Sequence, residues 1–324
     1  MFSYLLRRLL YAVPILLGVL LLTFVLFFAT QTPDSLAARV LGPNARAEAK
    51  KEWIARRGYD KPLLLNTQSG ATLFDSQFCN FIGRLSRFDL GLSDKTGESL
   101  NSKFAEGAIP SLCITLPAFL VGLCLSIGFA LYQVFVRNSA LDRLGTFLCV
   151  ALMSVPSMVY IIFGQSFLTL ALNWFPVSGF SRDGLSGAKF LVMPVLLMIV
   201  MRLGSEVRLY RAIFIEEIAQ DYIRTARAKG VSNPRLLLTH VLKNGLIALI
   251  TLLVAQLPML ILGSLLIESF FGIPGLGGML FNAFQQGDLA VVQAMVFLSS
   301  LLYIIGLTLT DILYAAVDPR IRLY

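Results

Sequence analysis

Six long apolar runs constrain this chain more than any other feature. The first extends from Leu9 to Ala29, and the others lie near residues 109–136, 144–172, 189–210, 244–268 and 289–317. Each run, at about 1.5 Å of helix per residue, is long enough to cross roughly 30 Å of hydrocarbon. With 56% hydrophobic residues the chain is also too apolar for a typical soluble domain. The sequence therefore predicts an all-α, polytopic membrane protein with six transmembrane helices.

The first run begins like a secretion signal, because Arg7 and Arg8 precede it. The apolar core of a signal peptide spans about 7 to 15 residues, however, and the run from Leu9 to Ala29 is longer. We expect it to remain as a membrane helix. Cleavage near the small residues Ser35 and Ala37 is the alternative.

The short basic flanks of the runs predict the orientation in the membrane. Arg7, Arg8 and the segments 137–143, 210–243 and 318–322 are all net positive, as is typical of cytoplasmic flanks. The formal net charge of +8 thus reflects membrane topology, and no basic patch interleaved with stacking aromatics points to nucleic acid. We expect both termini to be cytoplasmic.

The expected domain organisation has three parts. Residues 1–30 form an N-terminal transmembrane helix, residues 31–108 an external insertion, and residues 109–324 a membrane core. Within the insertion, Asn44 to Arg57 has the pattern of a capped helix that ends at Gly58. The insertion is too small to promise a domain that folds alone, so we expect it to pack on the outer face of the bundle.

The longest polar interruption in the second half of the chain is the segment 216–244. Its composition predicts a helix from Glu216 to Lys229, a left-handed cap at Gly230, and a second helix with Asn233 as N-cap and Pro234 in its first turn. Helical spacing would align a narrow stripe of small residues with bases on both sides. The stripe consists of Tyr222, Ala226 and Gly230, and the bases are Arg224, Arg227 and Lys229. The segment is either a cytoplasmic loop that merely follows the positive-inside rule or a docking element for a soluble partner.

Polar residues within the runs are few. Arg202 and Glu206 are four residues apart and should pair, and Glu268 lies toward the end of a run. Gln165 and Gln256 are the deeper candidates for lining a substrate path. Both glutamines are also suited to hydrogen bonding between helices, which is the alternative.

Neither an enzyme active site nor a metal site is indicated. The lone His240 has no second histidine or carboxylate cluster beside it, and no nucleophile with a base or nucleotide-binding glycine-rich loop is present. The cysteines lack metal-binding or redox spacing; they are Cys79, Cys113, Cys124 and Cys149. We expect no catalytic residue, no cofactor and no bound metal.

A resemblance to a known family rests on motifs spread along the chain. The segment DYIRTARAKG at 221–230, followed by His240 and Asn244, resembles the cytoplasmic EAA loop of ABC importers. Further motifs are LLRRLL near the start, GYDKPL at 58–63, FDLGLS at 88–93, FPVSG at 175–179, PGLG at 274–277 and DPRIR at 318–322. Together they resemble the first of the two permease subunits of dipeptide and oligopeptide ABC importers.

The resemblance implies a type I ABC importer permease in the inner membrane of a bacterium. Such a subunit forms half of a translocation path with a second permease, above two ATP-binding subunits that hydrolyse ATP. A periplasmic or lipid-anchored peptide-binding protein delivers the cargo, and membrane lipid surrounds the helices. The implied contacts with the ATP-binding subunits come from the EAA loop, at Glu217, Asp221, Tyr222, Arg224, Thr225, Ala226, Arg227, Ala228, Lys229 and Gly230.

Some positions depart from the family pattern. Arg224 and Lys243 occupy places where the general EAA motif has an acid and a proline, the outer loop 176–188 is short, and residues 66–76 look like an insertion. The outer differences leave open nickel or another small solute as cargo. A gradient-driven secondary transporter is the alternative from a different class, although it needs mid-membrane carboxylates, which are few here. A membrane scaffold is a third.

Overall fold

The protein's structure is a computed structural model that describes residues 2–28, 32–66, 72–181 and 184–317. These residues form helices joined by turns, with an isolated bridge between Leu92 and Ser99, which confirms the all-α class. They divide into two compact units. Unit 1 contains Ala108–Gly278 and the chain from Ile305 onward, and unit 2 contains Phe2–Gly107 and Met279–Ile304. The basic tail at 318–322, with its DPRIR motif, lies outside the described residues.

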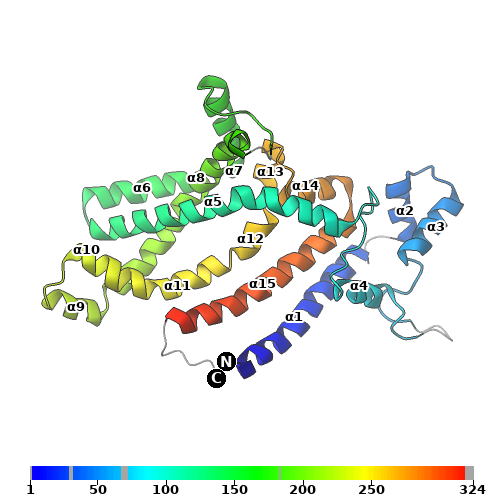
Figure 1. Cartoon of the computed structure of the whole chain (residues 1–324), viewed down its shortest axis with the longest axis horizontal. Coiled ribbons are helices and arrows are strands. Elements are labelled where there is room, and N and C mark those ends of the chain that lie inside the picture. The colour runs from blue at the N-terminus through cyan, green and yellow to red at the C-terminus, as the bar shows by residue number, and fades with distance from the viewer. Residues whose placement is uncertain (1, 29–31, 67–71, 182–183, 318–324) are drawn as a thin grey trace. The chain divides into compact units, whose positions relative to one another are not determined.

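Unit 1 is built from long helices that pack along one another (Figure 1). In chain order they are most of α5 (Leu100–Phe135), α6 (Ala140–Ser154), α7 (Ser157–Gly164), the π-helix η1 (Gln165–Ala171), α8 (Gly184–Ile218), α9 (Asp221–Ala228), α10 (Asn233–Leu236), the π-helix η2 (Leu237–Val241), α11 (Leu242–Val254), α12 (Leu257–Leu262), α13 (Leu265–Phe271) and the end of α15 (Leu289–Val317). The helix α6 packs along α8, and α11 packs against the same helix.

The helices of unit 1 carry large apolar side chains on their outer faces as well as inside. Phe129, Phe147 and Phe163 are each more than half exposed. A helix that is apolar all round fits a lipid environment, where the surrounding hydrocarbon is as apolar as the core. Among the described residues, four single helices and two bent helix pairs are long and apolar enough to cross a membrane. The chain is therefore a multi-pass membrane protein.

Two of the expected spans are broken rather than continuous. The run at 144–172 bends by 89° after Ser154, where Val155 is extended and Pro156 caps the next helix. The run at 244–268 was also expected to be one helix, but α11 ends at Val254 and a second break follows α12 at Gly263. Hydropathy records how apolar a run is and not where its helix stops, so these two boundaries were wrong.

Unit 2 combines the insertion with the ends of two long helices. Its elements are α1 (Phe2–Phe28), α2 (Pro33–Leu41), α3 (Ala47–Arg57), α4 (Gln77–Leu85), most of α14 (Leu276–Gln286) and the first half of α15. Phe24 of α1, Leu36 of α2 and Leu289 of α15 are buried together. The insertion therefore shares its core with the membrane helices of its own unit. The helix α3 begins at Ala47, later than expected, and ends as predicted at Gly58, whose φ is +70°.

A buried polar network ties the insertion to the start of α15. The hydroxyl of Ser93 and the backbone N–H of Asp94, at 3.1 Å, both donate to the carboxylate of Asp288. Asp94 in turn accepts a hydrogen bond from the N–H of Ala290 at 3.1 Å and pairs with Arg57 at 3.2 Å. Asp94 and Asp288 are 5% and 4% exposed, so two acids share a site with little water.

Burial raises the pKa of Asp94 to about 6. The guanidinium of Arg57 acts against this shift, Asp288 adds to it, and the Ala290 N–H and Arg84 oppose it. Because the pKa of the folded form lies above the ordinary value of 3.8, the folded form keeps a proton that the unfolded chain releases. The stabilisation by that proton is complete below about pH 4 and is lost as the pH rises through about 6.

We expect the free energy of unfolding of unit 2 to fall by on the order of 3 kcal/mol between about pH 4 and pH 6. Thermal unfolding followed by the fluorescence of Trp53 would measure this in a Trp174→Phe background, since these are the two tryptophans. The variant Asp94→Asn should flatten the dependence because its side chain does not titrate. An equal pH dependence in both proteins would contradict the assignment.

Candidate functional site

The polar segment 216–244 was expected to begin with one helix from Glu216 to Lys229, and that expectation is wrong. The helix α8 ends at Ile218, and α9 starts afresh at Asp221. The N–H groups of Ala219 and Gln220 donate back to the carbonyls of Glu216 and Glu217, at 3.3 and 3.2 Å, and close the end of α8. The extended backbone of Gln220 then turns the chain, so α9 is a short separate helix.

The turn at Gly230, after α9, has the predicted left-handed conformation. Gly230 has a φ of +79°, in the left-handed region that favours glycine. Its N–H donates to the carbonyl of Arg227 at 2.9 Å, and the N–H of Val231 donates to that of Ala226 at 3.2 Å. The next helix begins one residue earlier than expected, since the N-cap is Ser232 rather than Asn233.

One face of α9 packs into the core of unit 1. Ile223 and Ala226 are 1% and 8% exposed and belong to a cluster with Tyr210 and Phe214 of α8. The predicted stripe is therefore wrong as an exposed feature, because Ala226 is covered by its own chain while Tyr222 is 38% exposed. The inward face of this amphipathic helix centres on Ile223, and Tyr222 lies at its border.

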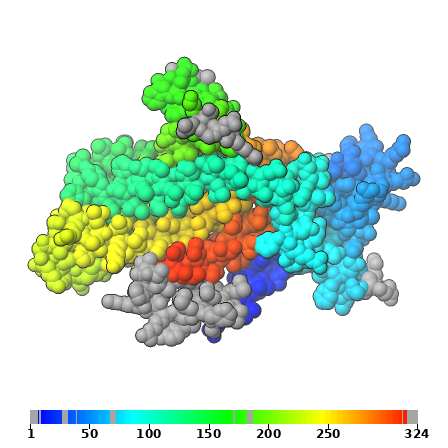
Figure 2. All heavy atoms as spheres, in the orientation of Figure 1, coloured from blue at the N-terminus to red at the C-terminus, as the bar shows by residue number. Residues whose placement is uncertain are grey.

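The opposite face of α9 is open to solvent at one end of unit 1 (Figure 2). We call it the α9 face; it consists of Asp221, Tyr222, Arg224, Thr225, Arg227, Ala228, Lys229 and the following Gly230. At its edge the hydroxyl of Tyr222 donates to the half-buried Glu217. Arg224 and Asp221 form an ion pair at 3.3 Å, and their side chains are 77% and 96% exposed.

Arg227 and Lys229 form no ion pair within the described part of the chain. The pair of Arg224 and Asp221 is so exposed that it contributes at most about 1 kcal/mol. The bases of the α9 face can therefore be redirected to acids on another molecule at little cost. The face is basic, solvated and carried on a helix whose other side is anchored.

A buried ion pair supports the base of this segment. Arg211 of α8 contacts Asp142, at the start of α6, through three hydrogen bonds of 2.8 to 3.2 Å. The Asp142 side chain is 8% exposed, so water competes little for the pair. The pair fixes the short 137–143 connection to α8 a few turns before α9.

The polar residues expected within the spans are engaged in contacts between helices. Arg202 pairs with Glu206 at 2.6 Å, which confirms that prediction, and also donates to Gln256. Gln165 donates to the carbonyls of Val177 and Phe270 at 3.2 Å. Both glutamines thus have the contacts expected of interhelical hydrogen bonding, and their role in a substrate path stays a prediction.

Glu268, which the sequence places toward the end of an apolar run, lies on α13 and is fully buried. Its carboxylate accepts hydrogen bonds from the hydroxyl of Ser111 at 2.9 Å and from the N–H groups of Ser264 at 3.0 Å and Gly278 at 2.8 Å. The Ser111 oxygen accepts the N–H of Leu276 at 2.8 Å. We call this group the Glu268 cluster.

The two glycines of the PGLG motif lie beside this cluster, where a larger residue would not fit. A side-chain carbon at Gly275 would collide with Glu268 and Ser111, and one at Gly277 would lie 2.7 Å from the backbone nitrogen of Leu265. The sequence does contain a signal for this site. Glu268 is a carboxylate within an apolar run, and Gly275 and Gly277 follow it within a few residues. No group of three or more potential metal ligands occurs among the residues that the structure describes.

Comparison with known proteins identifies the family. Residues 118–323 match the model of the binding-protein-dependent transport system inner membrane component. The chain belongs to this family. It is 31% identical to a Brucella abortus (strain 2308) protein named as a peptide transport system permease, over 99% of both chains. It is also 31% identical to a glutathione transport system permease protein of Salmonella typhimurium, again over 99% of both chains.

Membership in this family confirms the expected type I permease fold and a role as the membrane component of an ABC importer. Such a component transports and is not itself an enzyme. The matched region contains the whole segment 216–244 and every residue of the Glu268 cluster except Ser111. The α9 face is therefore part of the family's common core, whereas residues 2–107 lie before the matched region.

We expect Glu268→Ala to destabilise unit 1 by at least about 3 kcal/mol, because it leaves several buried donors without an acceptor. Glu268→Gln keeps one oxygen and should have an intermediate effect. Thermal unfolding of the purified protein, followed by circular dichroism, measures both. The exposed Glu216→Ala is the matched control. If Glu268→Ala were as stable as that control, the cluster would have no structural role.

Proposed function

We propose that this permease imports short peptides as one half of an ATP-driven translocation path. The observation that carries the proposal is similarity along the whole chain to relatives named for peptide transport and for glutathione transport. Glutathione is itself a small peptide, so both names agree on the chemical class. A second homologous permease subunit would supply the other half of the path.

The α9 face is the proposed contact with an ATP-binding subunit. Its exposed residues are Asp221, Tyr222, Arg224, Thr225, Arg227, Ala228, Lys229 and Gly230, with Glu217 at its edge. The bases can pair with acids around a groove on the partner, and the short helix can lie in that groove. Ala226 takes part indirectly, because its methyl group fixes α9 to the core.

The anchored side of α9 supports a mechanism of coupling. Ile223 and Ala226 lie in a buried cluster with residues of α8, α10 and η2, and Arg211 ties α8 to α6 through Asp142. A displacement of α9 by its partner would then move these helices together as a rigid body. When two ATP-binding subunits close on ATP, the docked helices approach each other. The translocation path then closes on one side of the membrane and opens on the other.

The proposed orientation places both termini and α9 in the cytoplasm. The basic flanks 137–143 and 210–243 support it by the positive-inside rule. The insertion would then face the outside, where a peptide-binding protein delivers the cargo. The membrane would be the bacterial inner membrane.

A gradient-driven transporter is less well supported by the described residues. Such a mechanism needs membrane carboxylates that are free to exchange ions. Glu206 is paired with Arg202, and Glu268 accepts three hydrogen bonds from its own unit. Both are already engaged within the fold.

Co-expression with the neighbouring transport genes tests the function as a whole. We expect the chain to co-purify with ATP-binding subunits, and the reconstituted complex to accumulate a labelled tripeptide only with ATP inside the proteoliposomes. Labelled nickel, offered in parallel, should not accumulate. Absence of an ATP-binding subunit from the purified complex would refute the proposal, and uptake of nickel alone would refute the peptide cargo.

We expect Gly230→Arg to lower ATP-driven peptide uptake at least about tenfold, because it places a long cation where α9 meets its partner. Space is open around Gly230, but its φ of +79° disfavours any side chain. Gly97→Arg is the matched control, since Gly97 has a φ of +72°, equally open space and a place in the insertion. Similar uptake by the two variants, measured at equal amounts of complex, would refute the docking assignment.

A further inference from the structure

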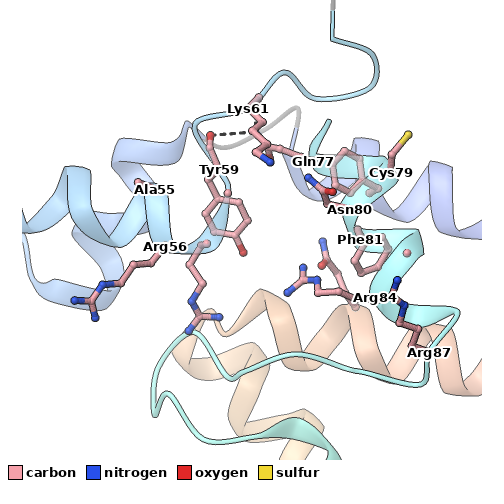
Figure 3. Close-up of a pocket in the computed structure, with 15 residues that line it drawn as sticks. Ala55, Arg56, Tyr59, Lys61, Gln77, Cys79, Asn80, Phe81, Arg84 and Arg87 are labelled. Carbon is pink, nitrogen blue, oxygen red and sulfur yellow. Dashed lines mark hydrogen bonds between the residues drawn. The ribbon is translucent and has the colours of Figure 1, made fainter. Parts of the chain in front are cut away.

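Unit 2 contains a cavity of about 520 Å³, and its lining includes neither the α9 face nor Gln165 or Gln256. The end of α3, the loop after it and the helix α4 form most of its wall (Figure 3). Phe24 of α1 and Gln293 of α15 complete the wall. Pockets that hold small ligands have volumes of about 300 to 1,000 Å³, so the cavity is large enough for a short peptide.

The lining of this cavity is strongly basic. Its five charged side chains are Arg56, Arg57, Lys61, Arg84 and Arg87, and no acidic residue is among the described residues that line it. Three of these bases have acidic partners outside the lining: Arg56 pairs with Glu52, Arg57 with Asp94 and Lys61 with Asp75. Arg84 and Arg87 form no ion pair within the described part of the chain. Two guanidinium groups of the lining are thus left for an anion.

The aromatic wall favours the same kind of ligand. The ring of Tyr59 and the side chain of Arg84 point into the same space (Figure 3). Burial raises the pKa of the Tyr59 hydroxyl above its ordinary value, so the group stays protonated and can donate a hydrogen bond. A carboxylate that enters this space would meet the guanidinium of Arg84 beside the Tyr59 ring.

Two buried glutamines add a requirement that a simple anion does not meet. Gln77 and Gln293 are 8% and 7% exposed, and both line the cavity. The amide nitrogen of Gln77 donates to the carbonyls of Tyr59 and Lys61, at 3.0 and 2.6 Å, while its oxygen has no partner within the described residues. The amide nitrogen of Gln293 is likewise without an acceptor there. Both atoms are covered by protein, so each amide must turn toward the cavity before it can meet a ligand N–H group or oxygen.

We propose that this cavity binds a short peptide by its C-terminal carboxylate. Arg84 and Arg87 would bind the carboxylate, as guanidinium groups match its planar pair of oxygens. Once turned toward the cavity, the Gln293 amide would donate to a ligand oxygen, and the Gln77 oxygen would accept a peptide N–H. The kind of ligand rests on the proposed function in peptide transport. The site is new in that it places peptide recognition on the insertion of the permease.

Inorganic phosphate and acidic protein surfaces share only part of this chemistry. Phosphate supplies oxygens and O–H donors, but it would not fill a cavity of about 520 Å³. An acidic side chain of a binding protein could reach the guanidinium groups, but it would not fill a cavity of about 520 Å³. A free peptide supplies the carboxylate, the N–H groups and the volume together.

A tryptophan reporter lies beside the cavity. The Trp53 ring is 5.6 Å from that of Tyr59, and the guanidinium of Arg57 lies 5.6 Å from the Trp53 ring centre. In the full chain carrying Trp174→Phe, fluorescence then reports on Trp53 alone. Trialanine, trialanine amide and sodium phosphate are titrated separately, and their apparent dissociation constants are compared.

We expect trialanine to bind saturably, and trialanine amide and phosphate each to bind with at least about tenfold lower affinity. Arg84→Gln should lower the affinity for trialanine about tenfold to a hundredfold, as the loss of charged hydrogen bonds implies. Arg46→Gln is the matched control, because Arg46 is exposed in the same insertion and does not line the cavity. Arg84→Gln should no longer distinguish trialanine from its amide.

Three results would overturn this site: equal affinity for trialanine and its amide, phosphate binding as tight as that of trialanine, or an unchanged affinity in Arg84→Gln. ATP-driven uptake by the reconstituted complex separates the two proposals. Normal peptide uptake without trialanine binding at Trp53 would reject the cavity and leave the importer function standing. Trialanine binding to a complex that accumulates no peptide would reject the importer function and leave the cavity.

Discussion

The requirement that every backbone polar group find a partner in an apolar environment governs this structure. A helix that ends inside the membrane core exposes N–H groups that lipid cannot satisfy. The chain breaks its fifth apolar run near Gly263, and Glu268 supplies acceptors for the N–H groups of Ser264 and Gly278 at the starts of two helices. Ser111 completes the cluster and accepts a third N–H. One buried carboxylate thereby permits a bend that the hydrophobic runs alone would not tolerate.

The same rule explains how the insertion is held and where it is left incomplete. Ser93, Asp94 and Arg57 connect through Asp288 to the start of α15, so the insertion is fixed by buried polar contacts as well as by its shared apolar core. Around the nearby cavity the rule is not fulfilled, because two buried amide atoms, on Gln77 and Gln293, lack protein partners among the described residues. Buried polar groups without partners are costly, which is why such a cavity is a reasonable place for a ligand.

The proposed docking function depends on the separation of anchored and exposed surfaces. One side of α9 is buried in the core of unit 1, and the other presents a basic, solvated face. A docking helix must keep its position in its own subunit while it contacts another, and this division meets both needs. The importer that we propose would therefore separate its tasks in space: ATP hydrolysis in the ATP-binding subunits, transmission at α9, and the cargo path among the spans.

The sequence by itself determined the class, the apolar runs, the pairing of Arg202 with Glu206, the left-handed turn at Gly230 and the family. These features depend on local pattern: hydropathy, a four-residue helical spacing, a glycine at a helix end and motif order. Only the tertiary structure decided that α8 and α9 are separate, that Ile223 and Ala226 face inward, and that Glu268 is buried among backbone N–H groups. Ser111 and Glu268 are distant in the chain, as are Asp94 and Asp288. Their partnership depends on helix packing, which no local pattern encodes.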